Sequence, residues 1–307
     1  MLRGILLVLF GACSFGILST FVKLAYKEGY TLGDVTGTQA LFGVILLWSI
    51  YFIQRKTQSK DQPKPVIKTH WLKLMLAGTV TGLVSLTYYQ CVKLIPASVA
   101  IILLMQFVWI SSLLEFIFFK KKPSKLQILA IIFILVGTVA ASGYYENTGG
   151  SLSLLGIGYG LVAALCYATF LLLNGNLGNE YPPIQKSALM ITGACILIFL
   201  VLPPHFLING ALGGSLFKWG LILAIFGTVI PPLCFASGIP KIGLTLSSIL
   251  SSAELPVAVS MSALVLHEQV SFIRWIGVLI ILSSMILPNL ENLKKANNFK
   301  RKLNKEA

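Results

Sequence analysis

Ten apolar segments divide the sequence of this 307-residue chain, and few charged side chains lie inside them. Each segment is about twenty residues long, the length that an α-helix needs to cross the hydrocarbon core of a membrane. The segments are 4–25, 34–53, 71–91, 97–119, 126–143, 153–173, 184–203, 218–238, 244–266 and 272–290. Backbone polar groups surrounded by lipid must be satisfied within the chain, so we expect each segment to be helical. The sequence therefore predicts an all-α integral membrane protein with ten transmembrane helices.

Composition supports this class. The chain is 56% hydrophobic and 11% charged, whereas a soluble domain carries about 25% charged residues. The five cysteines lie within or at the ends of apolar segments and form no C-x-x-C pair, which indicates small buried side chains. We expect no disulfide framework, no metal site and no cofactor. The first segment is longer than the apolar part of a signal peptide, so we expect it to remain as a membrane span.

The distribution of lysine and arginine predicts the orientation. If the N-terminus is cytoplasmic, nineteen of the 24 basic residues lie on the cytoplasmic side, in agreement with the positive-inside rule. Both termini are then cytoplasmic, in a plasma or inner membrane. The same distribution accounts for the net charge of +14 without nucleic acid as a partner. We expect the basic tail, 291–307, either to lie against anionic lipid headgroups or to be disordered.

The two halves of the sequence resemble each other. Residues 4–20 resemble 156–172, and 95–104 resemble 242–251, in the same order and at a nearly constant offset of about 150 residues. Apolar sequences can resemble one another by chance, but a constant offset favours a duplication. Five spans in each half force the halves into opposite orientations, as in the inverted repeats of many secondary transporters. We expect a first repeat at 1–148 and a second at 149–290, followed by the tail.

An acidic residue near the centre of the ninth segment is the first candidate for a functional site. A carboxylate at this depth costs several kcal/mol unless it faces a polar cavity or a partner, so we expect Glu254 to face a cavity. Pro256 removes a backbone donor beside it and favours a local helix break. The alternative is a structural role for Glu254, hydrogen-bonded to neighbouring helices.

At the equivalent place in the first half lies Gln106, with Trp109 one turn later on the same side of its helix. Gln106 could also be a simple helix-to-helix contact.

Other candidates lie in the third, sixth and eighth segments. The hydroxyl or ring of Tyr167 is well placed, by depth, to contact an organic substrate. Tyr88 and Tyr89 could do the same, or could anchor the protein at the membrane interface. Pro231 and Pro232 must interrupt the hydrogen bonds of the eighth helix, as a hinge, a cavity wall or a structural kink.

Two further acids have structural explanations. Glu115 lies near the lysine run 120–122, and we expect it to pair with those lysines. Glu268, followed by Ser271, is expected to cap the tenth helix.

Residues 247–287 carry a family resemblance. They are similar to the closing repeat of the EamA type within the drug/metabolite transporter (DMT) superfamily, on Glu254 with Pro256, Glu268 and Gly277. Pro256 is one residue later than in the usual pair. The first half departs from the pattern, because lysines 120–122 replace the acidic turn and no proline follows Gln106. The resemblance extends over about 4–290. It implies export of amino acids and related metabolites, or movement of nucleobases, sugars or vitamins.

No catalytic motif indicates an enzyme. The sequence has no phosphate-cradling G-x-x-x-x-G-K-[ST], no H-E-x-x-H and no G-x-S-x-G.

We predict a secondary transporter of small organic metabolites, exporting amino acids or related compounds by alternating access through a central cavity. Glu254 would titrate during the cycle or bind an ammonium group. The alternative is a non-transporting receptor or scaffold. The expected partners are a small-molecule substrate and a bilayer with anionic headgroups. The sequence leaves open the substrate, the direction, proton coupling, and whether the protein is a monomer or a homodimer.

Overall fold

The computed structural model describes residues 1–57, 68–95, 97–142, 153–267 and 270–288. Every regular element in these ranges is a helix, so the expected all-α class is confirmed. Seven helices are long and apolar enough to cross a membrane. They are α1 (Leu2–Lys27), α2 (Leu32–Thr57), α7 (Leu154–Asn176), α8 (Pro183–Val201) and the interrupted helices Ala100–Phe119, Leu216–Ile242 and Leu244–Val265.

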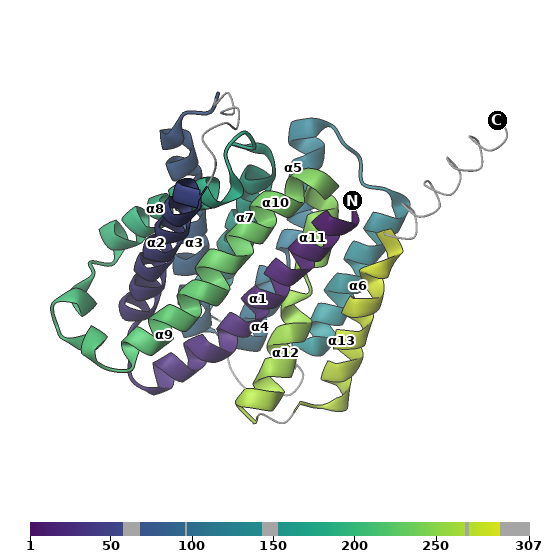
Figure 1. Ribbon diagram of the computed structural model, residues 1–307. Coiled ribbons are helices and arrows are strands. Elements are labelled where there is room, and N and C mark those ends of the chain that lie inside the picture. Colours follow the sequence, from purple (N-terminus) through teal and green to yellow (C-terminus); the bar gives the residue numbers. More distant parts are fainter. Residues whose placement is uncertain (58–67, 96, 143–152, 268–269, 289–307) are drawn as a thin grey trace.

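Three further helices complete the bundle in the described ranges. They are α3 (Trp71–Leu94), α6 (Lys125–Ala141) and α13 (Phe272–Ser284). The expected count of ten spans depends on these three also crossing the membrane. The start of α1 and the end of α13 lie at the same end of the bundle (Figure 1). The expected cap at Glu268 and the tail 291–307 lie outside the described residues.

Two of the interrupted helices break at a short turn near their centres. In the first half, α4 (Ala97–Leu104) and α5 (Phe107–Phe119) are separated at Met105–Gln106. In the second half, α11 (Leu244–Ser251) and α12 (Glu254–Val265) are separated at Ser252–Ala253. Pro256 lies in the first turn of α12, where a missing N–H leaves no helical hydrogen bond unmade. Glu254 is therefore the first residue of a new helix.

The third interrupted helix contains a π-helical turn. It runs through α9 (Leu216–Leu223), the π-helix η4 (Ala224–Val229) and α10 (Ile230–Ile242). Pro231 and Pro232 follow η4 directly, in the first turn of α10. Because proline has no N–H, the carbonyls one turn earlier lose their usual donors, and a wider turn accommodates this loss.

Several helix contacts recur in the two halves. Helix α1 packs along α10 and α12, and its counterpart α7 packs along α3 and α5. Helices α6 and α13, which are counterparts of each other, lie side by side at one edge of the bundle (Figure 1). This is the packing that two equivalent halves related by an approximate two-fold axis would produce.

The closest contact between helices joins α3 and α8. A Cβ atom added to Gly78 would lie 1.8 Å from the carbonyl oxygen of Met190, and one added to Gly193 would lie 1.8 Å from that of Met75. The two backbones therefore touch at two successive turns, which only glycine permits.

Acidic loop residues join the halves at both ends of α8. In the loop after α1, the Glu28 carboxylate accepts hydrogen bonds from the Ser215 hydroxyl at 2.5 Å and the Trp219 indole at 2.8 Å. In the loop after α7, the Glu180 carboxylate accepts one from the Thr69 backbone N–H at 2.6 Å. Hydrogen bonds to Thr69 lower the pKa of Glu180 to about 2, and those from Ser215 and Trp219 lower the pKa of Glu28. Each half therefore contacts the other through a loop carboxylate.

The buried acid at the end of α5 has a different partner from the one expected. Glu115 accepts hydrogen bonds from the backbone N–H and the hydroxyl of Thr245, at 2.8 Å and 2.5 Å. It thus caps the N-terminus of α11 instead of pairing with the lysine run. A helix N-terminus has unpaired N–H groups and a partial positive charge, both of which favour a carboxylate.

Candidate substrate cavity

A cavity of about 110 Å³ lies at the centre of the bundle, walled by α1, α2, α3, α4, α7, α8, η4 and α12. Its lining comes from the middle of α1, the first third of α2 and the second half of α3 and α8. All of these parts lie from the midpoint of the bundle toward the end where α2 begins. The cavity therefore extends from the centre toward one face, away from the start of α1.

Glu254 lies at the deep part of this cavity. The interruption before α12 places it at the start of a helix, where its side chain is partly exposed. The Tyr167 hydroxyl donates a hydrogen bond to the Glu254 carboxylate at 3.3 Å. Tyr167 itself is only 4% exposed, so packing fixes the position of its hydroxyl. Both residues line the cavity.

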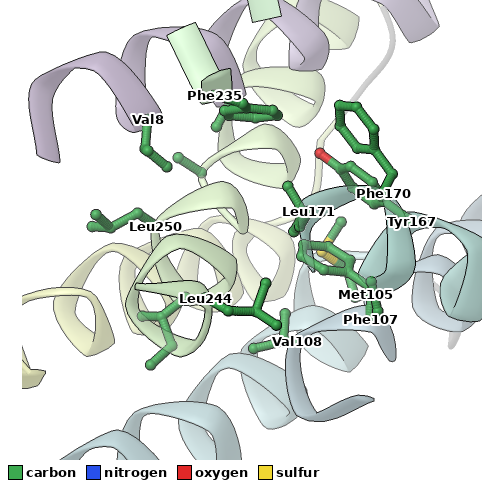
Figure 2. Packing of buried hydrophobic residues seen from close by; sticks show 14 of the residues in the cluster. Val8, Met105, Phe107, Val108, Tyr167, Phe170, Leu171, Phe235, Leu244 and Leu250 are labelled. Carbon is green, nitrogen blue, oxygen red and sulfur yellow. The ribbon is translucent and has the colours of Figure 1, made fainter. Parts of the chain in front are cut away.

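Aromatic side chains surround this pair. The Tyr167 ring lies 4.5 Å from the Phe107 ring and 6.0 Å from the Phe15 ring, centroid to centroid. Figure 2 shows Tyr167 beside Phe170 and Phe107, with its hydroxyl at the outer end of the ring. Phe15 and Phe170 both line the cavity as well.

Tyr88 and Tyr89 also line the cavity, from the second half of α3. The Tyr89 hydroxyl donates to the Gln39 side-chain oxygen at 3.5 Å. The structure thus brings both tyrosines to the same cavity as Glu254, although their place near a span end favoured an interfacial role.

Gln106 and Trp109 are not brought to this cavity. The Gln106 amide donates to the Ile102 carbonyl in its own helix at 2.9 Å. The Trp109 indole donates to the Gln106 side-chain oxygen at 2.8 Å, and 41% of Trp109 is exposed. Neither residue is part of the cavity lining. The expectation that they shape the cavity is therefore corrected, because the helix turn at Met105 directs the Gln106 side chain back onto its own backbone.

Several polar lining residues escaped sequence reasoning. They are Ser19, Thr36, Gln39, Thr81, Ser85 and Thr228. Within the described residues, the buried Thr81 hydroxyl has no hydrogen-bond partner. Gln39 was recognisable in principle, since it is a long polar side chain inside a predicted span, and such residues face the interior of a bundle. The π-helix η4 contributes Thr228, so the interruption at Pro231 and Pro232 adjoins the cavity wall.

A bundle of membrane-length helices around a cavity with an interior acid defines a multi-pass membrane protein with a solute-sized chamber. The model of the EamA-like transporter family matches residues 2–143 and 154–290, and the chain belongs to this family, within the DMT superfamily. It is a membrane transporter of the cell membrane. The two matched segments lie close to the two repeats expected from the sequence.

Relatives extend over the same length. The chain is 26% identical over 305 residues to the uncharacterized transporter YcbK of Bacillus subtilis, covering 95% of each chain. It is 24% identical over 318 residues to an uncharacterized transporter of Synechocystis, covering 95% of this chain and 94% of the relative. A solved crystal structure shares the fold with a TM-score of 0.73 at 15% identity, covering 92% of this chain and 97% of the other.

Proposed function

We propose that this protein is a ten-span secondary transporter that moves a small organic metabolite by alternating access, with Glu254 at the binding site. One observation supports this most directly: in a family of transporters, the cavity contains an acid at the centre of the bundle, held by Tyr167. An ionisable residue inside a membrane bundle marks a solute or ion pathway by default. We infer a transport site and not an enzyme site, since the lining offers one carboxylate with hydroxyls, an amide and aromatic rings.

The halves have the symmetry that alternating access requires. In inverted-repeat transporters, exchange of the two halves' conformations moves the opening from one side of the membrane to the other. The matching helix contacts of the two halves support such an exchange. With the N-terminus cytoplasmic, as the basic residues favour, the cavity described above faces outward. The lysine-rich cytoplasmic face then contacts anionic headgroups.

A single interior carboxylate provides a coupling mechanism. Away from bulk water, the Glu254 carboxylate is stabilised by a proton or by a bound cation, so binding of one releases the other. In a cell membrane that is acidic outside, protons loading Glu254 from the outward-facing cavity would drive a cationic solute outward. Efflux by proton exchange is the direction that this arrangement favours.

Thiol labelling tests the transporter against a receptor or scaffold without knowledge of the substrate. In a cysteine-free background, Ser85→Cys places a thiol in the cavity and Leu76→Cys, at a position 63% exposed on the same helix, places one on the outer surface. Membrane-impermeant thiol reagents should modify Ser85→Cys from either side of sealed vesicles, and Leu76→Cys from neither. Modification of Ser85→Cys from one side at most would exclude alternating access.

A further inference from the structure

The charge in the cavity has one sign. Glu254 is the only charged residue in the described lining, which includes no lysine, arginine or histidine. A positive charge on the solute therefore has a partner in the cavity. A negative charge has none, and it would lie in the same small space as the carboxylate.

The aromatic lining is suited to a positive charge as well. Five rings line the cavity, from Phe15, Tyr88, Tyr89, Tyr167 and Phe170. The face of an aromatic ring attracts an ammonium group, most strongly where water is excluded. The rings also offer apolar contact to the remainder of the solute, so the lining combines a cation site with an apolar chamber.

A carboxylate on the solute would be poorly compensated here. Hydroxyls such as that of Thr81 could donate to it, but a neutral donor offsets only part of the cost of removing a carboxylate from water. Of these hydroxyls, that of Tyr89 already donates to the Gln39 amide oxygen. A free amino acid would bring such a carboxylate close to Glu254.

The size of the cavity limits the solute. Its volume of about 110 Å³ is well below the roughly 300–1,000 Å³ of sites for drug-sized ligands. The chamber is thus suited to a small metabolite and not to a bulky drug.

We propose that the transported solute is a small organic amine without a carboxylate, bound as its ammonium ion between Glu254 and the aromatic rings. This proposal rests on the proposed transport function and narrows its substrate class. It differs from the amino-acid export that the family resemblance implies, because the lining provides for the amino group and not for the carboxyl group.

Matched compounds test the proposal. Isopentylamine, leucine and 4-methylpentanoate share one apolar body and differ in the amino and carboxyl groups, and phenethylamine, phenylalanine and 3-phenylpropionate form a second set. Thermal stabilisation of the purified full chain, followed by uptake into proteoliposomes, reports binding and transport. We expect the amines to bind at least tenfold more tightly than the amino acids, and the carboxylates not to bind.

Variants connect the result to the cavity. Glu254→Gln should abolish amine binding, Glu254→Asp should retain part of it, and Gln106→Ala, outside the cavity, should leave it unchanged. Equal binding of amine and amino acid, binding of the carboxylates, or no binding of either amine to folded protein would overturn the amine proposal. None of these results would affect the labelling of Ser85→Cys from both sides, so failure of the amine proposal is distinguishable from failure of the transport function.

Discussion

The two centrally broken helices, α4–α5 and α11–α12, occupy equivalent places in the two halves but differ in their polar side chains. At the first break, the Gln106 N–H donates to Leu103 instead of Ile102, and the Gln106 side chain supplies a donor to the Ile102 carbonyl. At the second break, the Ala253 N–H donates to Leu250, and the Ser252 hydroxyl donates to the Ile249 carbonyl at 2.6 Å.

This difference separates a side chain that supports the backbone at the break from a side chain that faces the cavity. At each break a carbonyl loses its usual N–H donor and needs another. At the second break the Ser252 backbone N–H also donates to this carbonyl, that of Ile249, at 3.3 Å. In the first half Gln106 meets this need itself and is directed away from the cavity. In the second half Ser252 meets it, which leaves Glu254, two residues later, free to face the cavity and Tyr167. A duplicated chain can thus keep the same backbone break and place a charge at only one of its two copies.

Of the variants that test this comparison, the one that replaces the acid by its amide should have the largest effect on transport. Glu254→Gln removes the charge but keeps the shape, so we expect amine transport to fall by about 100-fold or more, the loss of an ion pair in a poorly hydrated site. Proteoliposome uptake measures the effect. The thermal stability of the variant should be close to that of the wild type, because Ser252 still serves the break.

Gln106→Glu is the reciprocal change, and it tests whether a charge at the first break can also support transport. Gln106→Glu should create no second transport site, since this side chain lies outside the cavity. A Glu254→Gln, Gln106→Glu protein that regains transport would show that the two positions are interchangeable, contrary to the comparison.

Removal of the hydroxyl that holds the acid should have a smaller effect. Tyr167→Phe deletes one hydrogen bond to a carboxylate while keeping the buried ring, so we expect amine affinity to weaken about fivefold, or roughly 1 kcal/mol. Trp109→Phe, which removes a donor to Gln106, is the matched control and should leave affinity unchanged. Titration of the amine by thermal shift compares the two variants, and an equal loss in both would contradict the assignment of Tyr167 to the cavity.

Depth in the membrane could be predicted from the sequence, but rotation about a helix axis could not. Hydropathy placed Glu254, Gln106 and Tyr167 at the centre of their helices, and all three lie there. Which way each side chain points depends on packing and on the local hydrogen bonds of a break. For this reason Gln106 was wrongly assigned to the cavity, together with Trp109.

The same limit explains two other differences. Glu115 contacts the N-terminus of α11, which is remote in sequence, whereas proximity along the chain favoured the lysines. Gln39 was missed because it carries no charge that would mark it as a site residue. Tyr88 and Tyr89 could be neither assigned nor excluded, since α3 presents several faces to the bundle. These contacts depend on the tertiary arrangement of helices, which no local pattern specifies.

The loop carboxylates Glu28 and Glu180 give a second comparison of the two halves, away from the cavity. Glu180 has a pKa of about 2 against an ordinary value of 4.5. A lowered pKa in the folded state means that the contact with Thr69 stabilises the protein above about pH 4.5, and that this stabilisation is lost as the pH falls toward 2. Because Glu180 is partly exposed, we expect the effect to be below about 1 kcal/mol. Glu180→Gln should remove this part of the pH dependence of thermal unfolding.

The smallest effects on transport should come from the donors at the two breaks. Ser252→Ala removes one side-chain hydrogen bond and leaves the Ile249 carbonyl its bond from the Ser252 N–H, so we expect a loss of stability of about 0.5–1.5 kcal/mol. Gln106→Ala removes both the donor to Ile102 and the acceptor of the Trp109 indole, so we expect a larger loss. Thermal unfolding compares the two variants, and amine transport should persist in both because neither side chain contacts the solute. If Gln106→Ala were fully stable but inactive, Gln106 would act on the solute in another state of the cycle. The two halves would then differ in when their polar side chains face the cavity, and not in whether they do.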